Sequence, residues 1–224
     1  MARAESTVSF RTEVFAPDAY AQTAAQRISE SSPSSGAVVI TGGTTAALVY
    51  EHLDPPSSDI DVFFTDERCV PPDDDASNFK MATETFLSSG EARIHRMRGE
   101  LPPDEAAALY HGEIAPFVDE GIDLMLLGMG ADCHIGALYP NSPALKETLY
   151  CAAVDRPDGL AGLTLTPPAM RAARRVLVLV TGAAKKAAVS RVLDGTESVG
   201  TCPARLLADL PAVTFLLDEP AAGA

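Results

Sequence analysis

The strongest constraint on the fold of this chain is an alternation of short apolar runs with amphipathic segments. The apolar runs, which we interpret as buried strands, are residues 38–40, 60–64, 122–127, 175–180 and 213–217. Nearly continuous apolar runs are typical of parallel strands that helices cover on both faces. The pattern therefore predicts an α/β fold: a Rossmann-like open, mainly parallel sheet with helices on both faces.

Helices are expected between these runs: after residue 43, over residues 77–87, from 102 towards 118, and from about 183. Asp104 and Glu105 would lie in the first turn of the third helix, where acidic side chains favour the helix dipole. The sequence shows no internal repeat, and we interpret residues 156–162 as a surface loop. We therefore expect a single domain over residues 1–224.

Charge limits the classes of partner that the chain can have. It carries 31 acidic and 17 basic residues, a formal net charge of −14. Such a field repels nucleic acid and acidic membranes, so we expect neither as a partner. It also repels a phosphorylated metabolite, so an anionic substrate would need a local group of Arg and Lys side chains.

The sequence carries no signal for export or for membrane insertion. Residues 1–6 have no apolar core of a signal peptide, and no later run is long enough to cross a bilayer. The cysteines have neither Cys-x-x-Cys nor zinc-ligand spacing, which predicts free thiols at Cys69, Cys133, Cys151 and Cys202. We therefore expect a cytoplasmic protein with no metal site.

A glycine-rich segment follows the first predicted strand. It reads Thr41-Gly42-Gly43-Thr44-Thr45 and precedes a predicted helix. Paired glycines let a ligand approach the backbone, and free amides at a helix start can hold a phosphate. The alternative is a tight turn with a threonine cap. The segment has neither the Walker ending nor a Gly-x-Gly-x-x-Gly pattern, so no nucleotide cofactor is indicated.

Two further segments follow strands with polar residues. Asp66 and Arg68 follow residues 60–64, with Asn78 downstream, and an arginine there can bind phosphate bidentately. The alternative is an acid–base cluster on the surface. Asp132 and His134 follow the glycine-rich end of run 122–127, and histidine is the side chain best suited to accept a proton near neutral pH.

Together these segments resemble the 6-phosphogluconolactonase family. That family carries a Ser-Gly-Gly-Ser/Thr loop, Asp-Glu-Arg-x-Val-Pro with a later Ser-Asn, and Leu-Gly-Met-Gly-x-Asp-Gly-His followed by Leu-Phe-Pro. The matching stretches here are residues 41–45, 66–71, 77–78, 127–134 and 138–140. Residues 182–185 also match the family's Gly-x-x-Lys, whose lysine lies by the substrate phosphate, which adds Lys185 to the candidates.

The resemblance implies the fold of the glucosamine-6-phosphate deaminase and ribose-5-phosphate isomerase superfamily. It also implies hydrolysis, without a cofactor, of the small phosphorylated sugar lactone 6-phosphogluconolactone in the pentose phosphate or Entner–Doudoroff route. His134, assisted by Asp132, would deprotonate a water, while amides of the glycine loops steady the oxyanion. Arg68 and Lys185, with the region around Thr44 and Thr45, would hold the phosphate.

The chain also departs from the family's motifs. Cys133 replaces the glycine before the histidine, and we expect its Cβ to be tolerated only if the backbone avoids a positive φ. Gly162 stands where the family's Arg-Ile-Thr-Leu-Thr has its arginine, and residues 135–137 lack the usual hydroxyls. Two alternatives therefore stay open: an enzyme of the glucosamine-6-phosphate deaminase type, and a sugar-phosphate-binding relative without catalysis.

Overall fold

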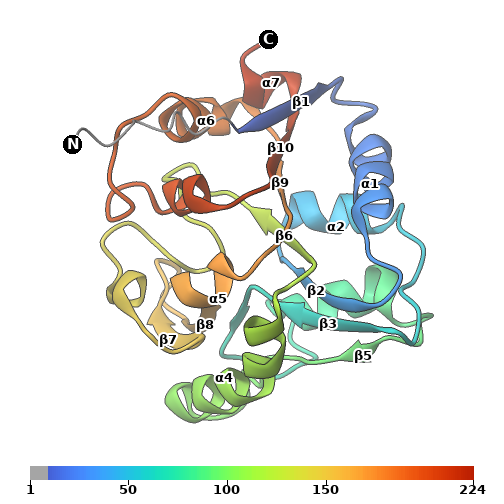
Figure 1. Ribbon diagram of the computed structural model, residues 1–224, viewed down its shortest axis with the longest axis vertical. Helices are drawn as coiled ribbons and strands as arrows, with labels where there is room; N and C mark the ends of the chain where they lie inside the picture. Colours follow the sequence, from blue (N-terminus) through green and yellow to red (C-terminus); the bar gives the residue numbers. More distant parts are fainter. Residues whose placement is uncertain (1–9) are drawn as a thin grey trace.

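A parallel sheet forms the centre of the molecule (Figure 1). The computed structural model describes residues 10–224, so the expectation for residues 1–6 lies outside the described part. In residues 10–224, seven strands pair in the order β1-β10-β9-β6-β2-β3-β5, and every pair is parallel. The bounds are β1 Arg11–Phe15, β2 Gly36–Ile40, β3 Ile60–Phe64, β5 Arg93–Ile94, β6 Leu124–Gly128, β9 Val176–Val180 and β10 Val213–Asp218. The predicted fold class is confirmed, although the two edge strands, β1 and β5, were not predicted.

Helices cover both faces of this sheet (Figure 1). One face carries α1 Tyr20–Ser31, α2 Thr44–Tyr50, α3 Asn78–Ala82 and a π-helical turn over Thr83–Leu87. The other carries α4 Pro103–Glu120, α5 Pro167–Arg171, α6 Lys186–Leu193 and α7 Glu219–Ala222, with short 3-10 turns at Pro143–Lys146, Ala183–Lys185 and Pro203–Asp209. No helix within residues 10–224 is both long and apolar enough to cross a bilayer.

Alternate side chains of each central strand enter opposite cores. In β9, Val176 and Val178 pack with α4 and α6, whereas Leu177 and Leu179 pack with α1 and α2. All four are at most 3% exposed. Full burial of one such side chain contributes about 1.5–3 kcal/mol, so both faces of the strand stabilise the sheet. This two-sided burial is the reason that the run lacks alternation in the sequence.

A small antiparallel sheet lies beyond the end of β3. Within the described residues it consists of β4 Asp66–Arg68, β8 Ala161–Leu165 and β7 Cys151–Asp155, in that order. The interpretation of residues 156–162 as a surface loop was wrong for part of the segment. Gly162 pairs with Arg68 inside this sheet, and the Arg156 side chain is only 9% exposed. Arg156, in the turn between β7 and β8, lines a polar cleft.

Candidate active site

The cleft lies where loops leave the carboxyl ends of adjacent parallel strands. The strands β2 and β6 are neighbours in the sheet. After β2 the chain forms β3, on the side of β2 that faces away from β6, whereas its next strand in this sheet after β6 is β9, on the side of β6 that faces away from β2. Loops diverge at such a switch point and leave a crevice, the usual ligand site of open α/β sheets. The crevice here is a cavity of about 200 Å³. Its lining includes nine of the ten residues that the sequence singled out: Gly42, Gly43, Thr44, Thr45, Asp66, Arg68, Asn78, His134 and Lys185.

The glycine loop between β2 and α2 is shaped by its neighbours. Gly42 packs against Asn78 so closely that an added Cβ would lie 1.9 Å from the Asn78 Oδ1 atom. Gly43 has a φ of +97°, a conformation that L side chains rarely adopt, and it faces open space. No side chain caps the N-terminus of α2. The amides that begin α2 are therefore accessible from the cleft, next to the hydroxyl of Thr45, which contacts Thr181 Oγ1 at 2.7 Å.

Arg68 is oriented by the N-terminus of α3. Its Nη1 donates to Asn78 Oδ1 at 2.9 Å and to the carbonyl of Ala76. Asn78 in turn donates from Nδ2 to the carbonyl of Asp66 at 2.8 Å. The Nε of Arg68 is buried without a hydrogen-bond partner among the described residues. The arginine is thus held by protein contacts at one edge while it still has donors for a ligand.

Glu67 points away from the cleft and fixes this edge from behind. Its carboxylate accepts from the backbone N–H groups of Arg68, Asn78 and Phe79 and from the Ser77 hydroxyl, at 2.7–3.0 Å. Burial raises the pKa of Glu67 above its usual value, even though these hydrogen bonds lower it. The carboxylate holds the β4 strand to the start of α3, which the sequence motif alone did not indicate.

His134 and Asp132 form a hydrogen-bonded pair in a tight turn after β6. The distance from His134 Nδ1 to Asp132 Oδ1 is 2.6 Å, and the same oxygen accepts from the His134 backbone N–H at 3.2 Å. With Nδ1–H bound to a carboxylate, Nε2 has the free lone pair that a base needs. Burial opposes ionisation of Asp132, but the adjoining His134 lowers its pKa below the ordinary 3.8. Asp132 does not line the cleft; it supports His134 from behind.

The turn requires a glycine and a strained residue. A Cβ at Gly130 would lie 2.1 Å from His134 Nδ1, so a side chain there would displace the imidazole. The expectation that Cys133 avoids a positive φ was wrong, because its φ is +71°. Tertiary contacts hold it there: its Sγ lies 3.8 Å from the Ala188 carbonyl, and its own carbonyl accepts from Ala204 N–H at 3.0 Å. The cysteine therefore keeps the left-handed turn that a glycine would adopt freely.

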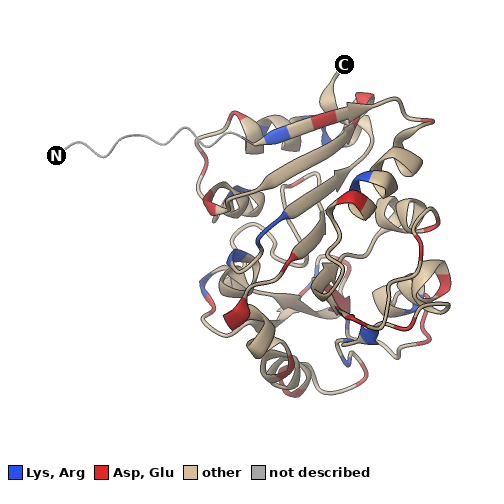
Figure 2. Ribbon diagram, turned by 45° about the vertical axis from the view of Figure 1, so that its right-hand side comes forward, with Lys and Arg blue, Asp and Glu red and all other residues tan. Residues whose placement is uncertain are grey.

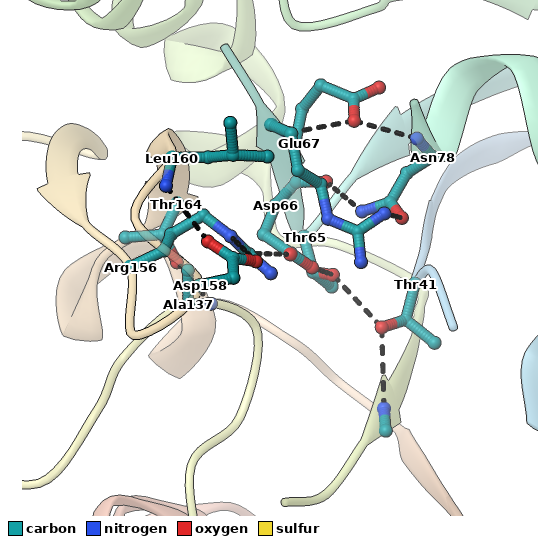
Figure 3. A network of polar contacts seen from close by, with 12 residues as sticks. Thr41, Thr65, Asp66, Glu67, Asn78, Ala137, Arg156, Asp158, Leu160 and Thr164 are labelled. Carbon is teal, nitrogen blue, oxygen red and sulfur yellow. Dashed lines mark hydrogen bonds and ion pairs between the residues drawn. The ribbon is translucent and has the colours of Figure 1, made fainter. Parts of the chain in front are cut away.

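A chain of hydroxyl groups joins three strand ends beneath the cleft (Figure 3). Thr65 Oγ1 donates to Asp66 Oδ1 at 2.9 Å and lies 3.2 Å from Thr41 Oγ1. Thr41 Oγ1 accepts from the N–H of Gly128 at 3.4 Å. The other oxygen of Asp66 faces Arg156 Nη1 at 3.5 Å. This network fixes the ends of β2, β3 and β6 relative to one another and orients the Asp66 carboxylate.

Comparison with known proteins places this arrangement in a family. A family model described as glucosamine-6-phosphate isomerases/6-phosphogluconolactonase matches residues 14–215. The chain belongs to this family. It is 35% identical over 199 residues to a 6-phosphogluconolactonase of Synechocystis and 34% identical over 209 residues to that of Mycobacterium tuberculosis, with 83% of each chain covered in both cases.

Solved structures agree with this assignment. A 6-phosphogluconolactonase from Thermotoga maritima superposes with a TM-score of 0.84 at 25% identity, covering 94% of this chain and 100% of the other. The enzyme from Trypanosoma brucei gives 0.83 at 26% identity, covering 96% and 98%. A monomeric glucosamine-6-phosphate deaminase gives 0.82 at 20% identity, covering 96% and 99%, and at that identity the likeness concerns the fold alone.

Several residues at the cleft were not among the candidates of the sequence analysis. Arg156, Tyr139 and Thr181 line the cleft, and Asp218 holds the loop before Lys185 by accepting from Gly182 N–H at 2.9 and 3.0 Å. A signal for Arg156 was present: a Pro-Asp-Gly turn between two short apolar stretches is typical of a hairpin. For Thr181 the signal was its place directly after a buried strand.

Proposed function

We propose that this protein is a 6-phosphogluconolactonase, which hydrolyses 6-phosphoglucono-1,5-lactone to 6-phosphogluconate with water alone. The observation that carries the proposal is the His134–Asp132 pair at 2.6 Å in a cleft that Arg68 and Lys185 also line. A base held by a carboxylate supplies proton transfer, and the cations supply anion recognition. The curated relatives and the neighbouring structures at 25–26% identity carry the same enzyme name, which supports the proposal.

In the proposed reaction, neutral His134 acts as general base. Its Nε2 takes a proton from a water molecule whose oxygen attacks C1 of the lactone. The tetrahedral intermediate then collapses, the bond between C1 and the ring oxygen breaks, and the imidazolium returns its proton to that oxygen. Asp132 holds Nδ1–H and stabilises the imidazolium in between. Such proton transfer contributes about 10²–10⁴-fold to the rate.

Phosphate recognition follows from the charge distribution. Acidic residues are spread over the helices and loops around the sheet (Figure 2), and the net charge is −14. Lys185 forms no salt bridge within residues 10–224, so its charge is available to a ligand. It follows β9, Arg68 follows β3, and the start of α2 lies between them. We propose that these two cations and the amides near Thr44 hold the phosphate.

We also propose that the reaction needs neither a metal ion nor a nucleotide cofactor. Within the described residues, no group of three His, Cys, Asp or Glu side chains is placed to hold a metal ion. A lactone carbonyl is already electrophilic, so a positioned water and a base suffice for its opening. We further propose a cytoplasmic location, because free cysteines suit a reducing compartment; cell fractionation would test it.

The experiment is an assay of the purified protein on freshly generated 6-phosphogluconolactone, corrected for spontaneous opening. Glucosamine 6-phosphate is run in parallel, because the matching family model includes its isomerases as well. The proposal predicts rapid lactone opening and no release of ammonia. Ammonia release from glucosamine 6-phosphate without lactone opening would identify a deaminase instead. Binding of 6-phosphogluconate without either reaction would identify a non-catalytic relative.

A further inference from the structure

Arg156 is a nearly buried cation whose donors are only partly used. Its side chain is 9% exposed, its Nε donates to Asp158 at 3.1 Å, and its Nη1 lies 3.5 Å from Asp66 Oδ2 (Figure 3). A guanidinium carries five N–H donors. The others form no hydrogen bond within residues 10–224, although Arg156 lines the cleft. It can therefore donate to a ligand without losing its present partners.

Arg156 lies towards the part of the cleft that contains His134. The Tyr139 ring is 4.7 Å from the His134 ring, measured between centroids. Burial raises the pKa of Tyr139, and Arg156 is near enough to oppose this rise. Tyr139 thus adjoins both the proposed base and the guanidinium. All three residues line the same cavity, so Arg156 and the proposed base face one shared cleft.

The reaction needs a donor for the oxygen that becomes negative, and two obvious backbone donors are engaged. The N–H of Gly128 donates to Thr41 Oγ1 at 3.4 Å, and the N–H of Gly130 donates to the His134 carbonyl at 2.9 Å. We propose that Arg156 donates to the carbonyl oxygen of the lactone as that oxygen becomes an oxyanion. This inference rests on the proposed lactonase function and names a residue outside the stretches of this chain that match the family's motifs in the sequence analysis.

The charges around Arg156 favour this role over phosphate binding. Asp66 and Asp158 both face its guanidinium and offset its positive charge, and Arg68 also lies near enough to Asp158 to lower its pKa. Arg156 therefore attracts a dianionic phosphate less strongly than an unpaired cation would, whereas it can still donate to a neutral carbonyl. The negative charge that develops on the carbonyl oxygen is smaller and forms only in the transition state, where a fixed donor stabilises it most. Arg68 and Lys185, the latter without a salt bridge within residues 10–224, remain the phosphate cations.

Gly162 makes room for this arginine. A Cβ at position 162 would lie 2.7 Å from Arg156 Cδ and 3.1 Å from its Cγ, so even a methyl group would press on the arginine stem. Position 162 on β8 is where the similar family motif has its own arginine. In this chain the aliphatic stem of Arg156, which lies in the turn after β7, fills the space beside that position instead. The inward position of the Arg156 side chain therefore depends on the absence of a side chain at position 162.

The test compares Arg156→Gln and Lys185→Ala on the phosphorylated lactone. For Arg156→Gln we expect kcat to fall about 10- to 100-fold, the range for one charge-assisted hydrogen bond, with KM changed less than about threefold. Inhibition by inorganic phosphate should be unchanged in Arg156→Gln and weakened in Lys185→Ala. The matched control is Arg171→Gln, which removes an arginine whose ion pair, to Asp209, is also 3.5 Å long but exposed. We expect it to behave like the wild type.

Two results overturn the inference: a kcat of Arg156→Gln within about twofold of the wild type, or a rise in KM and weaker phosphate inhibition at unchanged kcat. The second would make Arg156 a phosphate ligand. Failure of the proposed function is seen separately, as a wild-type protein without lactonase activity. Thermal unfolding of each variant checks that it is folded.

Gly162→Ala provides an independent variant. If its methyl group acts by displacing Arg156, it should lower kcat in the wild type and have little further effect in Arg156→Ala, which lacks Cγ and Cδ. An equal effect in both backgrounds would contradict the claim that Gly162 makes room for Arg156. It would show that the methyl group acts on the carbonyl of Glu67, 3.1 Å from the same position.

Discussion

Replacing Glu67 by alanine should destabilise the protein by about 3–5 kcal/mol, although the side chain contacts no substrate in our account. Alanine leaves the buried N–H of Asn78 and the partly buried N–H groups of Arg68 and Phe79 without their acceptor. Each unsatisfied donor costs about 1–3 kcal/mol. Two effects reduce the sum: water can reach part of the site, and the cost of burying a charge disappears. That cost is real, because burial raises the pKa of Glu67.

Glu67→Gln is the matched variant, since it keeps the volume and one acceptor oxygen. The second carboxylate oxygen of Glu67 accepts hydrogen bonds from Phe79 N–H and the Ser77 hydroxyl. In the glutamine variant an NH₂ group would face these two donors instead. We expect a loss of about 1–3 kcal/mol, smaller than for alanine. Urea unfolding followed by circular dichroism measures both losses. A change below about 0.5 kcal/mol for Glu67→Ala would refute the argument that this carboxylate holds β4 to α3.

Three further predictions concern charge and metal. Replacing Arg68 or Lys185 by alanine should weaken binding of the phosphorylated lactone by about 1.5–3 kcal/mol, with little effect on unphosphorylated gluconolactone; equal effects on both lactones would contradict the phosphate assignment. Arg93 and, more weakly, His95 lower the pKa of Asp61 against the effect of burial, so this stabilisation is present above the ordinary value of 3.8 and is lost as pH falls through the lowered value. Arg93→Gln should therefore lower the stability measured by urea unfolding at pH 7, and its difference from the wild type should shrink as the pH falls through the lowered pKa of Asp61. Exhaustive chelation should leave lactonase activity unchanged; a loss restored by one added metal would contradict the proposed metal-free reaction.

The parts of the fold predicted from the sequence are those that depend on local pattern. Residues 176–180 are apolar on both faces, and the structure buries both faces. Gly42, Arg68 and His134 each follow a predicted strand, and parallel strands bring their carboxyl ends to one edge. The strand β5, by contrast, has two residues, Arg93 and Ile94, which are too few for any periodicity.

The parts that the sequence did not reveal depend on distant partners. Arg156 is charged and precedes a Pro-Asp-Gly turn, features that are typical of a solvent-exposed loop. Its burial requires Asp66, ninety residues earlier in the chain, and a bare Gly162 on the neighbouring strand. The positive φ of Cys133 likewise depends on contacts with residues 188 and 204. Periodicity along the sequence carries no information about such contacts between distant residues.

The central claim is that His134 is the base for lactone opening, and His134→Asn tests it most directly. Asparagine can keep a side-chain N–H near the position of Nδ1, so the contact with Asp132 is preserved while the basic nitrogen is lost. On 6-phosphogluconolactone, corrected for spontaneous hydrolysis, we predict a fall in kcat of about 100-fold or more, with 6-phosphogluconate binding within about threefold of the wild type. A kcat within about threefold of the wild type would contradict the mechanism proposed for this cleft.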